Sequence, residues 1–168
     1  MACYREFPVS TVVYNAITLG GAGVAGAIVA AQFGPWALGG YVLLVTIAGV
    51  GVVATVCARC GYYGQRCGLG LGRVVPLLFA RGPEEEFFRT APQFVTTLLL
   101  VVALLLPIAG GVYLLVERYT TWRLVQLIAL VGLLLAGLAP HPGLVCRHCC
   151  QGARGACPVG QRLWQAGE

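Results

Sequence analysis

Long apolar stretches separated by short polar segments dominate the order of residues along this chain. No charged residue occurs between Glu6 and Arg59, a run of 52 residues. Because one helix crosses about 30 Å of hydrocarbon with roughly 20 residues, this run suits two crossings. The segment at 34–40, Gly-Pro-Trp-Ala-Leu-Gly-Gly, interrupts it, since proline and clustered glycines disfavour a continuous helix. The pattern predicts membrane spans near Val9–Phe33 and Leu38–Thr55.

The second half of the chain repeats this pattern. It is uncharged from Thr90 to the end of a predicted span at Phe94–Val116, which contains Pro107 as a candidate kink. A fourth predicted span, Trp122–Leu138, ends before the Pro-His-Pro at 140–142. The fold class that follows is an all-α membrane protein, with four transmembrane helices arranged as two tandem hairpins and cytoplasmic cysteine-rich loops.

This pattern divides the chain into three segments. Residues 1–73 form a first hairpin with its cysteine cluster, 74–93 an interfacial linker, and 94–168 a second hairpin with its cluster. Each hairpin follows an Arg-x-x-Pro sequence, which favours an internal repeat with an axis along the membrane normal. In the linker, Pro83 followed by three glutamates predicts a short interfacial helix, because carboxylates stabilise a helix N-terminus.

Composition and charge place this protein in a membrane. Apolar residues make up 58% and charged residues 10%, against roughly 25% charged in soluble domains. The arginines flank the spans and form no single patch, so we expect no nucleic-acid partner. Nine of the eleven basic residues lie on the side of the two termini: Arg5, Arg59, Arg66, Arg73, Arg81, Arg89, Arg147, Arg154 and Arg162.

The positive-inside rule then predicts a multi-pass protein of the cell inner (plasma) membrane, with both termini in the cytoplasm. A cleaved N-terminal secretory signal is the alternative, but the first apolar core is rather long for one. Small residues recur at four-residue spacing in the first span, as in Ala22, Gly26 and Ala30. Such spacing favours close helix packing, either within the chain or in a homodimer.

Two similar cysteine clusters follow the second and fourth spans. The first cluster is Cys57, Cys60 and Cys67; the second cluster is Cys146, Cys149, Cys150 and Cys157. Each contains a Cys-x-x-Cys pair, which brings two sulfur atoms to one tetrahedral metal, and two such pairs supply four ligands. Because cytoplasmic thiols are kept reduced, metal binding is favoured over structural disulfides. These seven cysteines are therefore the candidate metal ligands.

Several ligand sets remain open. Four cysteines would bind one zinc ion, or each cluster would bind its own metal with Cys150, His148 or Cys3 completing the set. An iron–sulfur cluster is the alternative cofactor, although the spacing differs from common ferredoxin sequences.

For function, the sequence favours a cytoplasmic, cysteine-ligated metal site with a structural or binding role. The alternatives are a membrane thiol or iron–sulfur redox protein and a soft-metal transporter. We assign no catalytic residue, because the chain contains no nucleophile–base set, paired carboxylates or nucleotide-binding motif, and an enzyme is the less favoured reading. The expected partners are the lipid bilayer and either a second copy of the chain or a larger membrane complex.

Overall fold

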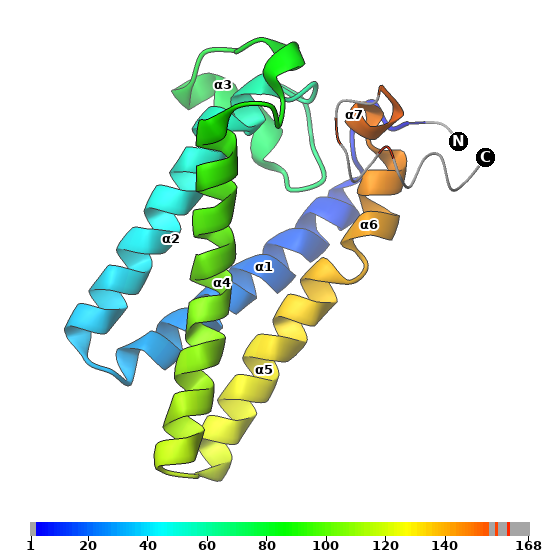
Figure 1. The fold of residues 1–168 in the computed structure, drawn as a ribbon. Coiled ribbons are helices and arrows are strands. Elements are labelled where there is room, and N and C mark those ends of the chain that lie inside the picture. Colours follow the sequence, from blue (N-terminus) through cyan, green and yellow to red (C-terminus); the bar gives the residue numbers. More distant parts are fainter. Residues whose placement is uncertain (1–2, 155–156, 158–160, 162–168) are drawn as a thin grey trace.

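The computed structural model describes residues 3–154, 157 and 161, so Arg162 lies outside the described residues. Every regular element in this part of the chain is helical. Figure 1 shows the four long helices, α1 (Val9–Ala31), α2 (Pro35–Thr55), α4 (Ala91–Glu117) and α5 (Thr121–Leu138). Each is long and apolar enough to cross a membrane, which confirms the predicted multi-pass architecture.

The short elements gather at one end of the bundle, opposite the α1–α2 and α4–α5 turns (Figure 1). We call this the cysteine end, because it contains Cys57, Cys60, Cys67, Cys146, Cys149 and Cys150. Its helices are α3 (Val75–Leu78), α6 (His141–Leu144) and α7 (Cys150–Ala153), with 3-10 turns η1 (Cys57–Arg59), η2 (Leu71–Arg73), η3 (Glu84–Glu86) and η4 (Cys146–His148).

The spans begin and end within a few residues of their predicted bounds, and the differences have local causes. The break in the first apolar run is shorter than predicted: α1 ends at Ala31, and Gly34, with φ +107°, directly precedes α2. Pro35 then starts α2, three residues before the predicted Leu38, because a first helical position needs no N–H. Pro107 lies inside α4, which continues past it. The helix predicted after Pro83 is one 3-10 turn.

Small residues allow the long helices to approach one another. The first helix of each half packs mainly on the second helix of the other half, α1 on α5 and α4 on α2. A Cβ on Gly26 would lie 2.3 Å from the Tyr41 hydroxyl, and one on Gly51 would lie 2.6 Å from the Thr96 methyl. At these two positions the small residues serve packing within the chain.

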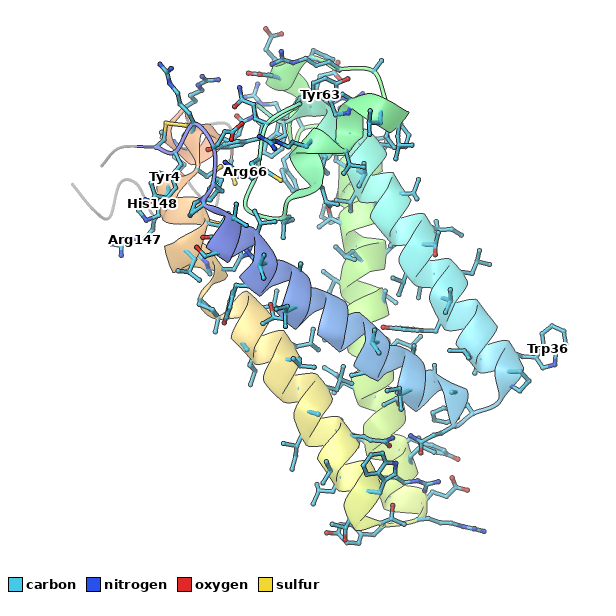
Figure 2. All side chains as sticks on the ribbon, turned by 180° about the vertical axis from the view of Figure 1, so that it is seen from behind. Tyr4, Trp36, Tyr63, Arg66, Arg147 and His148 are labelled. Atoms are coloured by element: carbon cyan, nitrogen blue, oxygen red, sulfur yellow. A yellow bond between two sulfur atoms is a disulfide. The ribbon has the colours of Figure 1, made fainter. Side chains whose placement is uncertain are left out.

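Large apolar side chains cover the outside of the bundle. Ile17, Leu43, Leu105 and Ile128 are exposed on the four long helices. Trp36 is 92% exposed and projects outward from the start of α2, at the end opposite the cysteines (Figure 2). An apolar exterior with an aromatic residue near one rim suits a lipid bilayer as the surrounding medium.

Buried polar side chains join the long helices to the loops of the cysteine end. Gln93, at the start of α4, donates from Nε2 to the Thr55 carbonyl at 2.9 Å, two residues before Cys57. Asn15 in α1 donates from Nδ2 to the Gly68 carbonyl at 3.0 Å. Both side chains are fully buried, so these bonds fix the depth at which the first cluster sits on the bundle.

Candidate metal centre

One cavity of about 310 Å³ at the cysteine end is lined by all six free cysteines. Three come from the first cluster and three from the second: Cys57, Cys60, Cys67, Cys146, Cys149 and Cys157. The remaining surface is mainly apolar and includes Phe7, Val56, Phe87 and Val145. All six thiols are half-buried. The structure thus brings sulfur atoms from both halves of the chain to one space.

The two Cys-x-x-Cys pairs have the same backbone conformation. A valine precedes each 3-10 turn, Val56 with φ −97° and ψ −55°, and Val145 with φ −114° and ψ −58°. The N–H of Cys60 donates to the Cys57 carbonyl at 3.2 Å, and that of Cys149 to the Cys146 carbonyl at 3.3 Å. Each turn therefore directs two sulfur atoms toward the cavity.

Glycines close the loop that positions Cys67. The Gly72 N–H donates to Cys67 Sγ at 3.3 Å, and the Gly64 N–H donates to the Gly72 carbonyl at 2.9 Å. A Cβ on Gly72 would lie 2.3 Å from the Gln65 carbonyl oxygen, so no side chain fits there. Gly70 has φ +79°, a conformation that favours glycine. The glycine-rich sequence thus folds the first cluster back on itself.

A segment before α1 joins the two clusters. In this N-terminal strap, Tyr4–Phe7, the Tyr4 N–H donates to the His148 carbonyl at 2.9 Å and the Phe7 N–H donates to the Arg66 carbonyl at 3.0 Å. The Tyr4 ring stacks on the His148 ring, with centroids 4.5 Å apart (Figure 2). Phe7 is 1% exposed and forms part of the cavity wall.

Tyr62 completes this connection between the two clusters, which we call the joint. Its hydroxyl donates to the Tyr4 carbonyl at 2.7 Å and accepts from the Cys150 N–H at 3.1 Å. The Tyr62 ring packs against Phe7 with centroids 5.4 Å apart. One phenol therefore contacts the first cluster, the N-terminal strap and the second cluster. The sequence does not indicate this role for Tyr62, because its partners are 58 and 88 residues away.

The apolar cavity disfavours the thiolate forms of Cys60 and Cys149. Burial raises the pKa of Cys60 to about 11, and the neighbouring Cys149 and Cys67 add to this rise. Burial also raises the pKa of Cys149, with Cys157 and Cys67 adding to it. These mutual effects show that thiols of both clusters are near enough to repel one another as thiolates. A bound cation would reverse that balance.

Cys150 is the predicted ligand that the structure places elsewhere. It forms a disulfide with Cys3, and neither residue lines the cavity. The expectation that all eight cysteines are reduced thiols therefore differs from the structure at this pair. In the disulfide, the Cys150 sulfur has no thiolate to offer a metal. The adjacent Cys149 turns toward the cavity instead.

The structure places His141 at the cavity, and not the candidate ligand His148. His148, the better ligand candidate by sequence, stacks on Tyr4 and is not part of the cavity wall. His141, between two prolines, does line the cavity, and its Nδ1 lies 3.4 Å from Asn15 Oδ1. The turn of α6 after the fourth span brings it there, a placement that residue spacing alone did not reveal.

The six thiols surround the cavity without converging on one point. Among the described residues, no group of three or more His, Cys, Asp or Glu side chains is close enough to hold a metal ion. A tetrahedral zinc with Zn–S distances of about 2.3 Å needs sulfur atoms roughly 4 Å apart. Binding of a single zinc ion would therefore require the loops to draw inward.

Comparison with protein-family models, curated proteins and solved structures gives no match to this chain. Its function must therefore be argued from the cavity and the membrane helices themselves.

Proposed function

We propose that this protein is an integral membrane protein that binds a metal centre through thiolates of both cysteine clusters, with a structural or binding role. The observation that carries the proposal is that six free cysteines, three from each half, line one cavity. A metal bound there would tie the two helical hairpins together at the cysteine end. Its ligands would come from Cys57, Cys60, Cys67, Cys146, Cys149 and Cys157.

The chemistry of these six cysteines favours a bound metal over six thiols that bind nothing. Isolated buried cysteines behave as small hydrophobic residues. Six in one mainly apolar cavity are costly to ionise, because burial foremost, and the neighbouring thiols in addition, raise the pKa values of Cys60 and Cys149. A divalent cation or cluster removes this cost, because it deprotonates the thiols and neutralises their charge.

Zinc is the first candidate, since four thiolates from two Cys-x-x-Cys pairs form one of its common structural sites. An iron–sulfur cluster is the second candidate, and two observations favour it. The cavity of about 310 Å³ with dispersed thiols suits a larger group than one ion. The Gly72 N–H points to Cys67 Sγ, and such hydrogen bonds to sulfur are typical of iron–sulfur sites.

A thiol–disulfide redox role is less well supported. The Cys3–Cys150 disulfide next to Cys149 is a potential exchange partner. Exchange requires an attacking thiolate, and burial disfavours that form of Cys149 by raising its pKa. Soft-metal transport has equally little support, because the cavity reaches Val52, Thr97 and Leu100 of the spans but meets no ionisable side chain at those positions.

The tandem arrangement of the hairpins is part of the proposal. Two features support it: the matching turns at Cys57 and Cys146, and the reciprocal packing of α1 on α5 and of α4 on α2. A twofold axis along the membrane normal would exchange both pairs.

Orientation and membrane are likewise proposed. Eight described arginines lie on the cysteine side of the spans, which supports a cytoplasmic location in the inner membrane. The Cys3–Cys150 disulfide weighs against it, since the cytoplasm is reducing. Labelling single cysteines placed at Ser10 and Trp36 with a membrane-impermeant maleimide in intact cells, in a background without native cysteines, decides the question. Labelling only at position 36 supports the proposal, and labelling only at position 10 contradicts it.

The direct test is metal analysis of protein purified without oxygen, combined with an absorption spectrum. We expect zinc without visible absorption, or iron with sulfide and visible bands. The Cys57→Ser/Cys146→Ser variant removes one thiol from each half and should lose most of the metal. Cys3→Ser, which lies outside the cavity, is the matched control and should keep it. Wild-type protein with neither zinc nor iron would refute the proposal.

A further inference from the structure

A second cavity at the cysteine end differs in chemistry from the thiol cavity. Its volume is about 280 Å³, and it lies between the loop that follows Cys60 and helix α7. Its polar lining comes from Arg5, Gln65, Gln151 and Arg154. We propose that this cavity, the basic pocket, binds a phosphate group, either of an anionic phospholipid or of a free phosphate.

The charged side chains in the wall of the basic pocket are both positive. Arg5 and Arg154 approach it from opposite ends of the chain, and no carboxylate of the described residues is part of its wall. No ion pair between described residues includes Arg5. Arg154 contacts Glu84 at 3.4 Å, but Glu84 also pairs with Arg81, and the Arg154 side chain is 65% exposed. Both guanidinium groups therefore have donors for an anion.

Gln151 gives independent support. It is 3% exposed, and its Nε2 has no hydrogen-bond partner among the described residues apart from the neighbouring Cys60 sulfur, which is a weak acceptor. This amide lies over Gly61, where a Cβ would approach it to 3.1 Å. Gly61 and Gln151 both line the pocket, so this amide donor lies at its wall. Buried donors are normally paired, and an anion oxygen would serve as the acceptor.

Phosphate suits this set of groups better than a carboxylate does. Guanidinium groups bind phosphate oxygens through paired hydrogen bonds, and a phosphate has oxygens for two arginines and an amide together. The position also fits a lipid headgroup, since Arg5 lies four residues before the start of α1. Basic pockets beside transmembrane helices bind the headgroups of anionic lipids.

The test is calorimetric titration of the full-length protein in detergent with three probes: dihexanoyl phosphatidylglycerol, dihexanoyl phosphatidylcholine and inorganic phosphate. We expect saturable binding of phosphatidylglycerol or of inorganic phosphate. The Arg5→Gln/Arg154→Gln variant should bind about tenfold more weakly. Arg89→Gln/Arg147→Gln removes the same charge outside the pocket, and it should bind as tightly as the wild type.

The pattern of results identifies the source of the phosphate. Binding of phosphatidylglycerol alone assigns the site to lipid, whereas binding of inorganic phosphate assigns it to a free anion. Phosphatidylcholine binding as tightly as phosphatidylglycerol, no binding by either anion, or full affinity in Arg5→Gln/Arg154→Gln would overturn the proposal. Zinc and iron content, measured on the same samples, shows whether the thiol cavity is intact and keeps this result separate from the metal proposal.

Discussion

The two cysteine clusters share one local turn but are held in place by different means. In the first cluster, the chain supplies its own support: the loop after Cys60 folds back, and Gly72 contacts both Gln65 and Cys67. The second cluster sits on two four-residue helices, α6 and α7, and is tied to the N-terminus by the Cys3–Cys150 disulfide. The turn is thus a property of the motif, while its position depends on the surroundings.

The comparison also shows where the two halves depend on each other. The N-terminal strap belongs to the first half by sequence, yet Tyr4 bonds to His148 of the second cluster and Phe7 to Arg66 of the first. Ring stacking and the Tyr62 hydroxyl reinforce this contact. A change in the first cluster's loop, in the joint, or in the disulfide should therefore have effects of different size and location.

The largest effect is expected from Gly72→Ala, which acts on the first cluster alone. The new methyl carbon would lie 2.3 Å from the Gln65 carbonyl oxygen and 2.5 Å from that of Tyr62. Because both obstacles are backbone atoms, the loop must move, at a cost of about 3 kcal/mol in stability. Thermal unfolding in detergent measures the loss, and metal analysis should show reduced binding.

Gly132→Ala is the matched control, because a Cβ at Gly132 in α5 meets nothing within 4 Å. It should leave both the unfolding midpoint and the metal content unchanged. If Gly72→Ala behaved like this control, the loop would not determine the position of Cys67, and the proposed difference between the clusters would be wrong.

Tyr62→Phe should have the next largest effect, because it removes the joint and leaves each cluster's own support intact. Without the hydroxyl, the Tyr4 carbonyl and the Cys150 N–H lose their partner. The expected loss is about 1–2 kcal/mol in stability. Tyr113→Phe, at an exposed position of α4, is the control and should be neutral in the same unfolding measurement. Equal midpoints for the two variants would count against Tyr62 as the joint.

The sequence predicted the parts of this architecture that depend on short-range patterns. Hydrophobic run length predicted the four spans, and Cys-x-x-Cys spacing predicted which cysteines act in pairs, because both patterns are local in the sequence. The joint depends on contacts across the whole chain, such as Tyr4 with His148. No local pattern indicates that Tyr62 meets a carbonyl 58 residues away or that Cys3 pairs with Cys150.

The thiol cavity shows the same limit. Cys57, Cys60, Cys67, Cys146, Cys149 and Cys157 were predicted as ligands from spacing, and all six line one cavity. Cys150 belonged to the same motif, yet it pairs with Cys3 because the N-terminal strap runs beside α7. Residue spacing predicted which cysteines lie at this end of the bundle. The path of the N-terminal strap determines which of them, Cys150, does not line the cavity.

Removing the disulfide acts on the second cluster and should have a smaller effect than Tyr62→Phe. A link across 147 residues would stabilise a free chain by roughly 4–5 kcal/mol through loop closure. Here the membrane spans already restrict the conformations of the unfolded chain. We therefore expect Cys3→Ala/Cys150→Ala to lose about 1 kcal/mol in stability. Dithiothreitol should lower the wild-type unfolding midpoint and leave the double variant unchanged. A reductant effect of equal size in both would refute this assignment.

The smallest expected effect concerns the ion pairs between the N-terminal strap and the first cluster. Glu6 accepts hydrogen bonds from Arg73 at 3.3 Å and from Arg66 at 2.8 Å, and these partners, Arg73 foremost, lower its pKa. A lowered pKa stabilises the folded state above the unfolded pKa, near 4.5, and this contribution is lost as the pH falls through the lower folded value. Thermal midpoints of Glu6→Gln should therefore fall less than those of the wild type between about pH 6 and about pH 3. Glu85→Gln is the control, because it removes a carboxylate that forms no ion pair among the described residues. If Glu85→Gln changed the acid dependence as much as Glu6→Gln does, the ion pairs of Glu6 would not be what binds the N-terminal strap to the first cluster.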